Sequence, residues 1–198
     1  NPPDVRQKTS EREKIEKPLQ GKGKLKIIPL GGLGEIGRNM TVLEYDDRII
    51  GLDMGLGFPE LDMPGIDFTI PNTKYLQDHK NKILGVIFTH GHYDHIGAVP
   101  YIIERIGNPP LFASALTAAI IKKRQTDFPH GPRLNLKVVK ENEIIKLGPF
   151  TVSFFHVNHN IPDDFGIKID LPIGTIINTS DFKFDPHPIN DKPTDMAK

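Results

Sequence analysis

The chain has 198 residues, 25 basic and 25 acidic side chains, and no cysteine. This length suffices for one well-buried core, the balanced charge gives no bulk electrostatic argument for a nucleic-acid partner, and the lack of cysteine excludes disulfides and thiolate metal sites. No apolar run reaches the length of a membrane span and the first residues lack a secretory core, so we expect a cytoplasmic protein with no membrane contact.

Residues 1–23 are predicted to form a disordered polar arm. This stretch is rich in proline, lysine and glutamate and has few large aliphatic side chains, so it buries too little apolar surface to offset the entropy of ordering it. Contact of this arm with RNA phosphates is the alternative to a solvated tail. We expect residues 24–198 to hold the folded part of the chain.

Residues 25–30 predict a strand that runs into a glycine-rich loop. The spacing Gly32-x-Gly34-x-x-Gly37 matches the dinucleotide-binding fingerprint, which requires a helix directly after the loop. Residues 40–45 instead alternate like a strand. We therefore predict a β-hairpin at this loop and no dinucleotide site.

The next predicted strand, residues 48–53, ends in Asp53. A buried carboxylate at a strand end needs a polar partner, and the second N–H of a metal-binding histidine is a natural one. A turn-capping aspartate is the alternative.

The densest chemical signal is His90, His92, Asp94 and His95, which follow the apolar strand predicted at residues 83–88. Imidazole nitrogen and carboxylate oxygen are the ligands that zinc and similar divalent ions take. His90 and His92 are two residues apart in extended chain and can share one ion. Asp94 and His95 come where a helix is expected to begin and can face a second ion, although Asp94 could also be a helix N-cap.

In the predicted elements, strands outnumber helices, and helices follow groups of strands without strict alternation. We predict helices at residues 71–80, 96–106 and 115–125, and strands at residues 111–113, 137–139, 150–157, 165–170 and 174–179. The strand at 150–157 delivers His156 and His159, which face opposite ways in extended chain, so one of them is expected to be a ligand. The residues alone do not choose between the two, and Asp181 at a strand end is a weak signal by itself.

The run His90-x-His92-x-Asp94-His95 resembles the signature of the metallo-β-lactamase superfamily. The glycine loop and the segments at residues 64–67, 160–163 and 181–185 resemble the ribonuclease J family within it. The resemblance covers residues 24–198 and implies an α/β (α+β) fold, the four-layer αβ/βα sandwich. It covers only the first part of that domain, so the β-CASP insert, the rest of the domain and the C-terminal domain are expected to be absent.

The resemblance also implies the roles of the site residues. It assigns His90, His92 and His159 to one divalent ion, Asp94 and His95 to a second, and Asp181 to both, with Asp94 also catalytic and Asp53 supporting a ligand histidine. Zinc is the expected metal, with manganese or magnesium as alternatives. The implied activity is endonucleolytic and 5′-to-3′ exonucleolytic hydrolysis of RNA by a water activated between two ions, in a protein expected to be a homo-oligomer at full length.

Two departures from the family pattern qualify this hypothesis. Tyr93 stands where members commonly carry an acidic residue, and the family's last metal-binding histidine has no counterpart here. We therefore expect this chain to bind the first metal better than the second and to cleave RNA weakly or not at all. The alternatives are another hydrolase of the superfamily, acting on a thioester or lactam, and a non-catalytic, metal-stabilised RNA-binding module.

Overall fold

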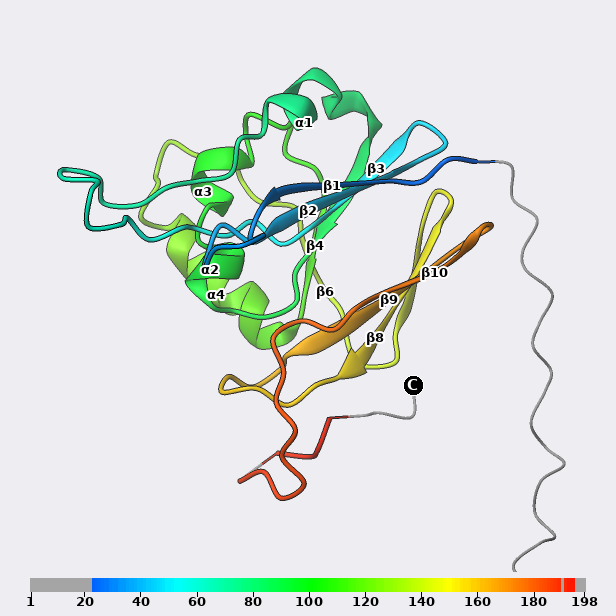
Figure 1. Cartoon of the computed structure of the whole chain (residues 1–198). Helices are drawn as coiled ribbons and strands as arrows, with labels where there is room; N and C mark the ends of the chain where they lie inside the picture. The colour runs from blue at the N-terminus through cyan, green and yellow to red at the C-terminus, as the bar shows by residue number, and fades with distance from the viewer. Residues whose placement is uncertain (1–22, 190, 195–198) are drawn as a thin grey trace, which may run out of the picture.

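The computed structural model describes residues 23–189 and 191–194, so almost all of the predicted arm, residues 1–23, lies outside the described residues. The described chain is a mixed α/β fold of two sheets that pack face to face, with helices over the outer face of the larger sheet (Figure 1). The predicted fold class is therefore confirmed.

The larger sheet has six strands in chain order. They are β1 (Lys26–Gly31), β2 (Met40–Tyr45), β3 (Arg48–Leu52), β4 (Ile83–Ile87), β5 (Leu111–Ala113) and β6 (Leu136–Val138). The first three pair antiparallel and the rest pair parallel. The hairpin between β1 and β2 confirms that the glycine loop does not open a helix.

The smaller sheet has four antiparallel strands, in the order β10-β9-β8-β7. They are β7 (Ile144–Leu147), β8 (Phe150–His156), β9 (Phe165–Leu171) and β10 (Gly174–Asn178). The sequence did not predict β7, a short edge strand whose residues are exposed or half-buried. Along β8, buried and half-buried residues alternate, as expected for a strand with one face in the core.

The helices are short apart from the last. They are α1 (Lys74–Asp78), the 3₁₀ turn η1 (Lys80–Lys82), α2 (Tyr93–Ile96), α3 (Val99–Ile102) and α4 (Ala115–Gln125). No helix of the described chain is long and apolar enough to span a membrane. Helix α4 has the predicted bounds.

The single helix predicted at residues 96–106 is wrong. The chain forms α2 and α3 with a break between them, because the amide of Ala98 donates to the carbonyl of Met54, 2.9 Å away in another loop. Pro100 then occupies the first turn of α3, where its missing N–H costs nothing.

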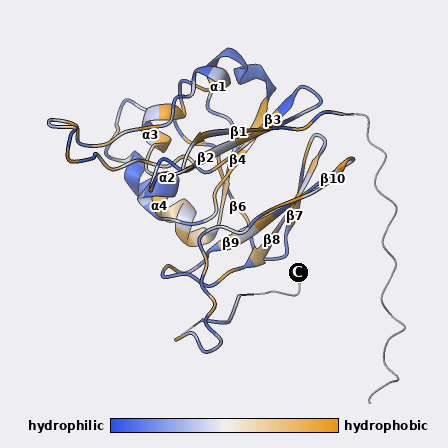
Figure 2. Cartoon of the chain, viewed as in Figure 1, coloured by the Kyte–Doolittle hydropathy of each residue, from blue (hydrophilic) through white to orange (hydrophobic). Residues whose placement is uncertain are grey.

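Two hydrophobic layers hold the sheets and helices together. Val42, Ile49 and Val86 pack against the helices, whereas their chain neighbours Leu43, Ile50 and Ile87 pack against the smaller sheet. Strand β4 is therefore buried on both faces, as its apolar run predicted. Figure 2 shows hydrophobic residues on central strands such as β3 and β4, and a hydrophilic α1 at the surface.

The smaller sheet carries no helix on its outer face within the described residues. Side chains such as Thr151, Ser153 and Lys168 point to that face and are half-buried. The described chain thus supplies three layers of the predicted four-layer sandwich.

Candidate metal centre

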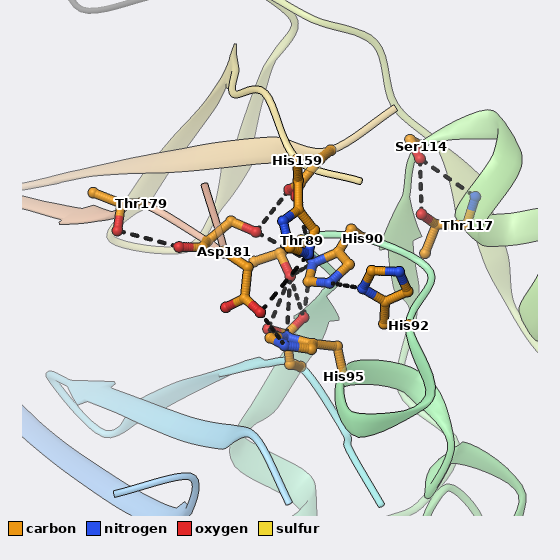
Figure 3. Close-up of polar contacts among 12 residues, drawn as sticks. Thr89, His90, His92, His95, Ser114, Thr117, His159, Thr179 and Asp181 are labelled. Atoms are coloured by element: carbon orange, nitrogen blue, oxygen red, sulfur yellow. Dashed lines mark hydrogen bonds and ion pairs between the residues drawn. The ribbon is translucent and has the colours of Figure 1, made fainter. Parts of the chain in front are cut away.

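The predicted site residues lie in loops where strands of both sheets end. Asp53 follows β3, the histidine cluster follows β4, His159 follows β8 and Asp181 follows β10. Figure 3 shows the side chains of the histidines and Asp181 turned toward one another from these separate segments. The two-sheet packing therefore brings together residues that are about ninety positions apart in the chain.

Three imidazoles form the first donor group. One ring nitrogen each from His90, His92 and His159 lie within 4.8 Å of one another, and His90 Nε2 is 2.9 Å from His92 Nδ1. The ring of His159 stands 5.1 Å from the rings of both other histidines. Three imidazoles with an open fourth position are a donor set that suits zinc.

His156, the other histidine of this strand, lies outside the group. It is buried, and its Nε2 is 2.9 Å from the carbonyl of Lys192 and 3.4 Å from a carboxylate oxygen of Asp191. His156 thus holds the segment near residue 191, while His159 faces the other histidines.

A second donor group shares His90 with the first. It contains His90, His95 and Asp181. Asp181 Oδ2 is 3.6 Å from His95 Nε2 and 3.9 Å from His159 Nε2, so this carboxylate lies between the two groups. Asp94 Oδ2 is 3.5 Å from His95 Nε2, which places all six predicted ligands in one cluster.

Asp94 is positioned by the start of α2. The N-cap of this helix is His92, which makes no side-chain cap, so the N-cap alternative for Asp94 is wrong. The side chain of Asp94 is partly exposed, and one of its oxygens accepts a 3.3 Å hydrogen bond from Asn39 Nδ2. It is free to meet a small molecule at the rim of the cluster.

Asp53 lies directly behind His95. Its Oδ2 is 2.9 Å from His95 Nδ1, and its carboxylate also accepts hydrogen bonds from the backbone N–H and the hydroxyl of Thr89, at 2.9 Å and 3.0 Å. The backbone of Asp53 has a positive φ of 60°, a conformation that aspartate tolerates better than most residues. The geometry matches the supporting contact predicted from the sequence.

Burial and neighbouring charges shift the pKa values of the two buried histidines, His90 and His95, in opposite directions. Burial, with the neighbouring His95 and His92, lowers the pKa of His90 to about 3, so this imidazole is neutral. Burial also opposes a charge on His95, but the carboxylates of Asp53, Asp181 and Asp94 outweigh it and raise the pKa of His95 to about 10. The hydrogen bond with His95 lowers the pKa of Asp181 to about 2. Without metal, the cluster therefore has an imidazolium at His95 between carboxylates and a neutral imidazole at His90.

The sequence analysis missed Asp164, a buried carboxylate next to His90. Its Oδ1 accepts a 2.6 Å hydrogen bond from Ser180 Oγ, its Oδ2 is 3.8 Å from His90 Nδ1, and burial raises its pKa to about 8. The available signal was an acidic residue directly before the apolar strand β9.

A backbone contact that the sequence did not reveal holds the cluster in place. Gly55 lies between Asn39 and α2: its N–H donates to Asn39 O at 3.0 Å, and a Cβ there would overlap Asp94 O. The amide of Met54 donates to His95 O at 2.6 Å. Only glycine permits this close approach of two backbones.

Two hollows reach the cluster from opposite sides. A groove of about 840 Å³ runs from His159 past Ser114 to Lys183, and a second of about 510 Å³ is lined by His95, Asp181 and the glycine loop. Tyr93 points away toward α4, where the Arg124 guanidinium lies 5.7 Å from its ring centroid. Residues of the cluster thus line both hollows, His159 in the first and His95 with Asp181 in the second.

Sequence comparisons match this chain to known proteins. The model described as "Beta-lactamase superfamily domain" matches residues 63–184. The chain is 43% identical over 180 residues to ribonuclease J of Thermus thermophilus, covering 88% of this chain and 31% of that protein. It is 40% identical over 183 residues to ribonuclease J of Helicobacter pylori, covering 91% of this chain and 26% of that protein. The chain thus spans about a third or less of these curated relatives.

Solved structures show the same fold at low identity. A protein of unknown function from Enterococcus faecalis V583 superposes with a TM-score of 0.61 and 21% identity, covering 81% of this chain and 44% of that one. The metallo-β-lactamase fold protein YhfI from Bacillus subtilis gives a TM-score of 0.54 and 18% identity, covering 79% and 62%. Zn(2+)-bound PqqB from Methylobacterium extorquens gives 0.54 and 13%, covering 76% and 63%.

Proposed function

Because this chain belongs to the β-lactamase superfamily and is ribonuclease J-like over most of its length, we propose that it forms the metal-binding part of a ribonuclease. The reaction is hydrolysis of RNA phosphodiesters, endonucleolytic and 5′-to-3′ exonucleolytic. A cytoplasmic location and a homo-oligomeric full-length protein stay predictions.

The observation that carries the proposal is the convergence of six donor side chains at the shared end of two sheets. His90, His92 and His159 hold one divalent ion, while Asp94 and His95 hold the second, with Asp181 between them. The neutral state of His90 supports this assignment, because a metal binds unprotonated imidazole. Histidine and carboxylate donors suit zinc first, with manganese or magnesium as alternatives.

Bound ions supply Lewis acidity, which lowers the pKa of water and offsets charge on a phosphate. The chain's own residues do the positioning. Asp53 holds the ring of His95 through Nδ1, and Asp94, which is partly exposed, is placed to accept a proton from the attacking water. The two hollows beside the cluster give an RNA strand a path across it.

The three-histidine group is expected to fill first. The second group must release the proton that carboxylates hold on His95, and the first group does not contain His95. Zinc titration followed by calorimetry should therefore show one tight and one weaker event. We expect RNA cleavage by the 198-residue chain to be weak or absent.

The test combines zinc titration with cleavage of end-labelled RNA, by this chain and by a longer chain that includes the region matching the rest of the relatives. His90→Ala should abolish both zinc events and any cleavage, whereas the remote buried variant Glu44→Gln should leave both unchanged. Zinc-independent cleavage, or zinc binding unaffected by His90→Ala, would contradict the proposed function.

A further inference from the structure

The Nδ1 atom of His90 faces two hydroxyl groups inside the protein. Thr89 Oγ1 lies 3.0 Å from it and Ser180 Oγ lies 3.3 Å from it. Each hydroxyl has a carboxylate on its other side: Thr89 Oγ1 is 3.0 Å from Asp53 Oδ2, and Ser180 Oγ is 2.6 Å from Asp164 Oδ1. The two hydroxyls therefore connect one imidazole to two buried carboxylates.

This arrangement selects one tautomer of His90. The Thr89 hydroxyl donates to Asp53 Oδ2 and the Ser180 hydroxyl donates to Asp164 Oδ1, so each hydroxyl keeps only lone pairs for His90. Nδ1 must then carry the ring proton, because a fully buried imidazole left without this bond would lose a hydrogen bond that water cannot replace. The lone pair of Nε2 is left to face His92, on the side of the donor groups.

Asp164 has no evident use in holding the fold. It is 1% exposed, and within the part of the chain that the structure describes its Oδ2 atom has no hydrogen-bond partner. Burying such a group costs folding free energy. A costly carboxylate beside a candidate site is a sign of a functional constraint.

We propose that Asp164, acting through the Ser180 hydroxyl, is a positioning residue that fixes the Nδ1–H tautomer of His90 and so directs Nε2 to the metal. The inference rests on the proposed metal centre. The direct gap of 3.8 Å between Asp164 Oδ2 and His90 Nδ1 exceeds a hydrogen bond, so the hydroxyl is required. Ser180 has a positive φ of 58°, an uncommon conformation for serine, and directly precedes Asp181.

A double-mutant cycle in zinc affinity tests the relay. Ser180→Ala and Asp164→Leu should each weaken zinc binding about tenfold to a hundredfold, as for other groups that orient a ligand. The double variant should be no worse than either single variant, because both changes break one relay. Asp164→Asn keeps an acceptor oxygen and a similar shape, so it should retain most of the zinc affinity. It is the variant to compare with Ser180→Ala if Asp164→Leu fails to fold.

The tautomer itself gives a second measurement. Nitrogen NMR of the zinc-free protein should show predominantly the Nδ1–H tautomer for His90, and a smaller excess of it in Ser180→Ala, where Thr89 Oγ1, 3.0 Å away, still accepts from Nδ1. Glu44→Gln is the matched control, because Glu44 is a buried carboxylate with its own partners, Lys26 and Tyr75. It should change the free energy of unfolding without altering zinc affinity or the His90 tautomer.

Three results would overturn the inference: unchanged zinc affinity in both single variants, additive losses in the double variant, or an unchanged ratio of His90 tautomers in Ser180→Ala. A wild-type chain that binds no zinc but shows the excess of the Nδ1–H tautomer, reduced in Ser180→Ala, would instead count against the proposed metal centre.

Discussion

Replacing Asp53 by asparagine should destabilise the metal-free protein strongly. The asparagine carbonyl oxygen can still accept from Thr89, but its NH₂ group would face the Nδ1–H of His95 in place of the carboxylate oxygen that now lies 2.9 Å away. The loss combines a charge-assisted hydrogen bond, about 1.5–3 kcal/mol, with a buried imidazolium deprived of its main partner. Breaking one side of such a pair costs about 3–5 kcal/mol. Because Asp181 and Asp94 remain beside His95, we expect the lower end, about 3 kcal/mol.

The effect should depend on pH in one direction. The folded-state pKa of His95 is raised from 6.5 to about 10, so its stabilising contribution is complete below pH 6.5 and is lost as the pH rises toward 10. The difference between wild type and Asp53→Asn should therefore be largest near pH 6 and small near pH 10.

Urea denaturation in the presence of a chelator, at pH 6 and at pH 9.5, measures this difference. Asp170→Asn removes a more exposed carboxylate, 3.3 Å from Lys168, and serves as the control with an expected loss below about 1 kcal/mol. The reasoning fails if Asp53→Asn costs less than about 1 kcal/mol at pH 6, or if its cost grows as the pH rises.

Two further pairs of variants test the site's construction. His159→Ala should weaken zinc binding by more than the roughly hundredfold typical of residues that only orient a metal ligand. His156→Ala should leave zinc affinity nearly unchanged and increase hydrogen exchange near residue 191. Equal effects of the two variants on zinc affinity would contradict the assignment of His159 as a ligand. Gly55→Ala should cost more than about 3 kcal/mol of unfolding free energy, because the new Cβ would overlap Asp94 O. Gly34→Ala is the control, because no atom lies within 4 Å of a Cβ at this position and only its positive φ opposes the change. It should cost about 1 kcal/mol of unfolding free energy. Similar losses of stability for both glycines would refute the steric argument.

The sequence correctly predicted those elements whose formation depends on short-range patterns in the chain. The alternation of residues 40–45 indicated the hairpin of β1 and β2, and the helix predicted at residues 115–125 forms as α4 with those bounds. The histidine cluster was also visible, since four donor groups within six residues have no packing purpose. These features depend on neighbours in the chain.

What the sequence did not predict depends on contacts between distant segments. The break between α2 and α3 comes from a hydrogen bond to Met54, about forty residues earlier. The importance of Asp164 depends on Ser180, which reaches it from the next strand's end, and on burial that no local pattern encodes. The choice between His156 and His159 needed either the family resemblance or the fold, because strand parity alone allowed both.

The division of the cluster between the two sheets has a mechanical consequence. His90, His92 and His95 follow a strand of the six-stranded sheet, while His159 and Asp181 follow strands of the four-stranded sheet. An ion bound by both sets is a removable cross-link at one end of the sandwich, so withdrawing it should loosen β8–β10 from their partner sheet before either sheet unravels. Metal binding would then add stability at this one end of the sandwich, beyond what the core between the sheets supplies.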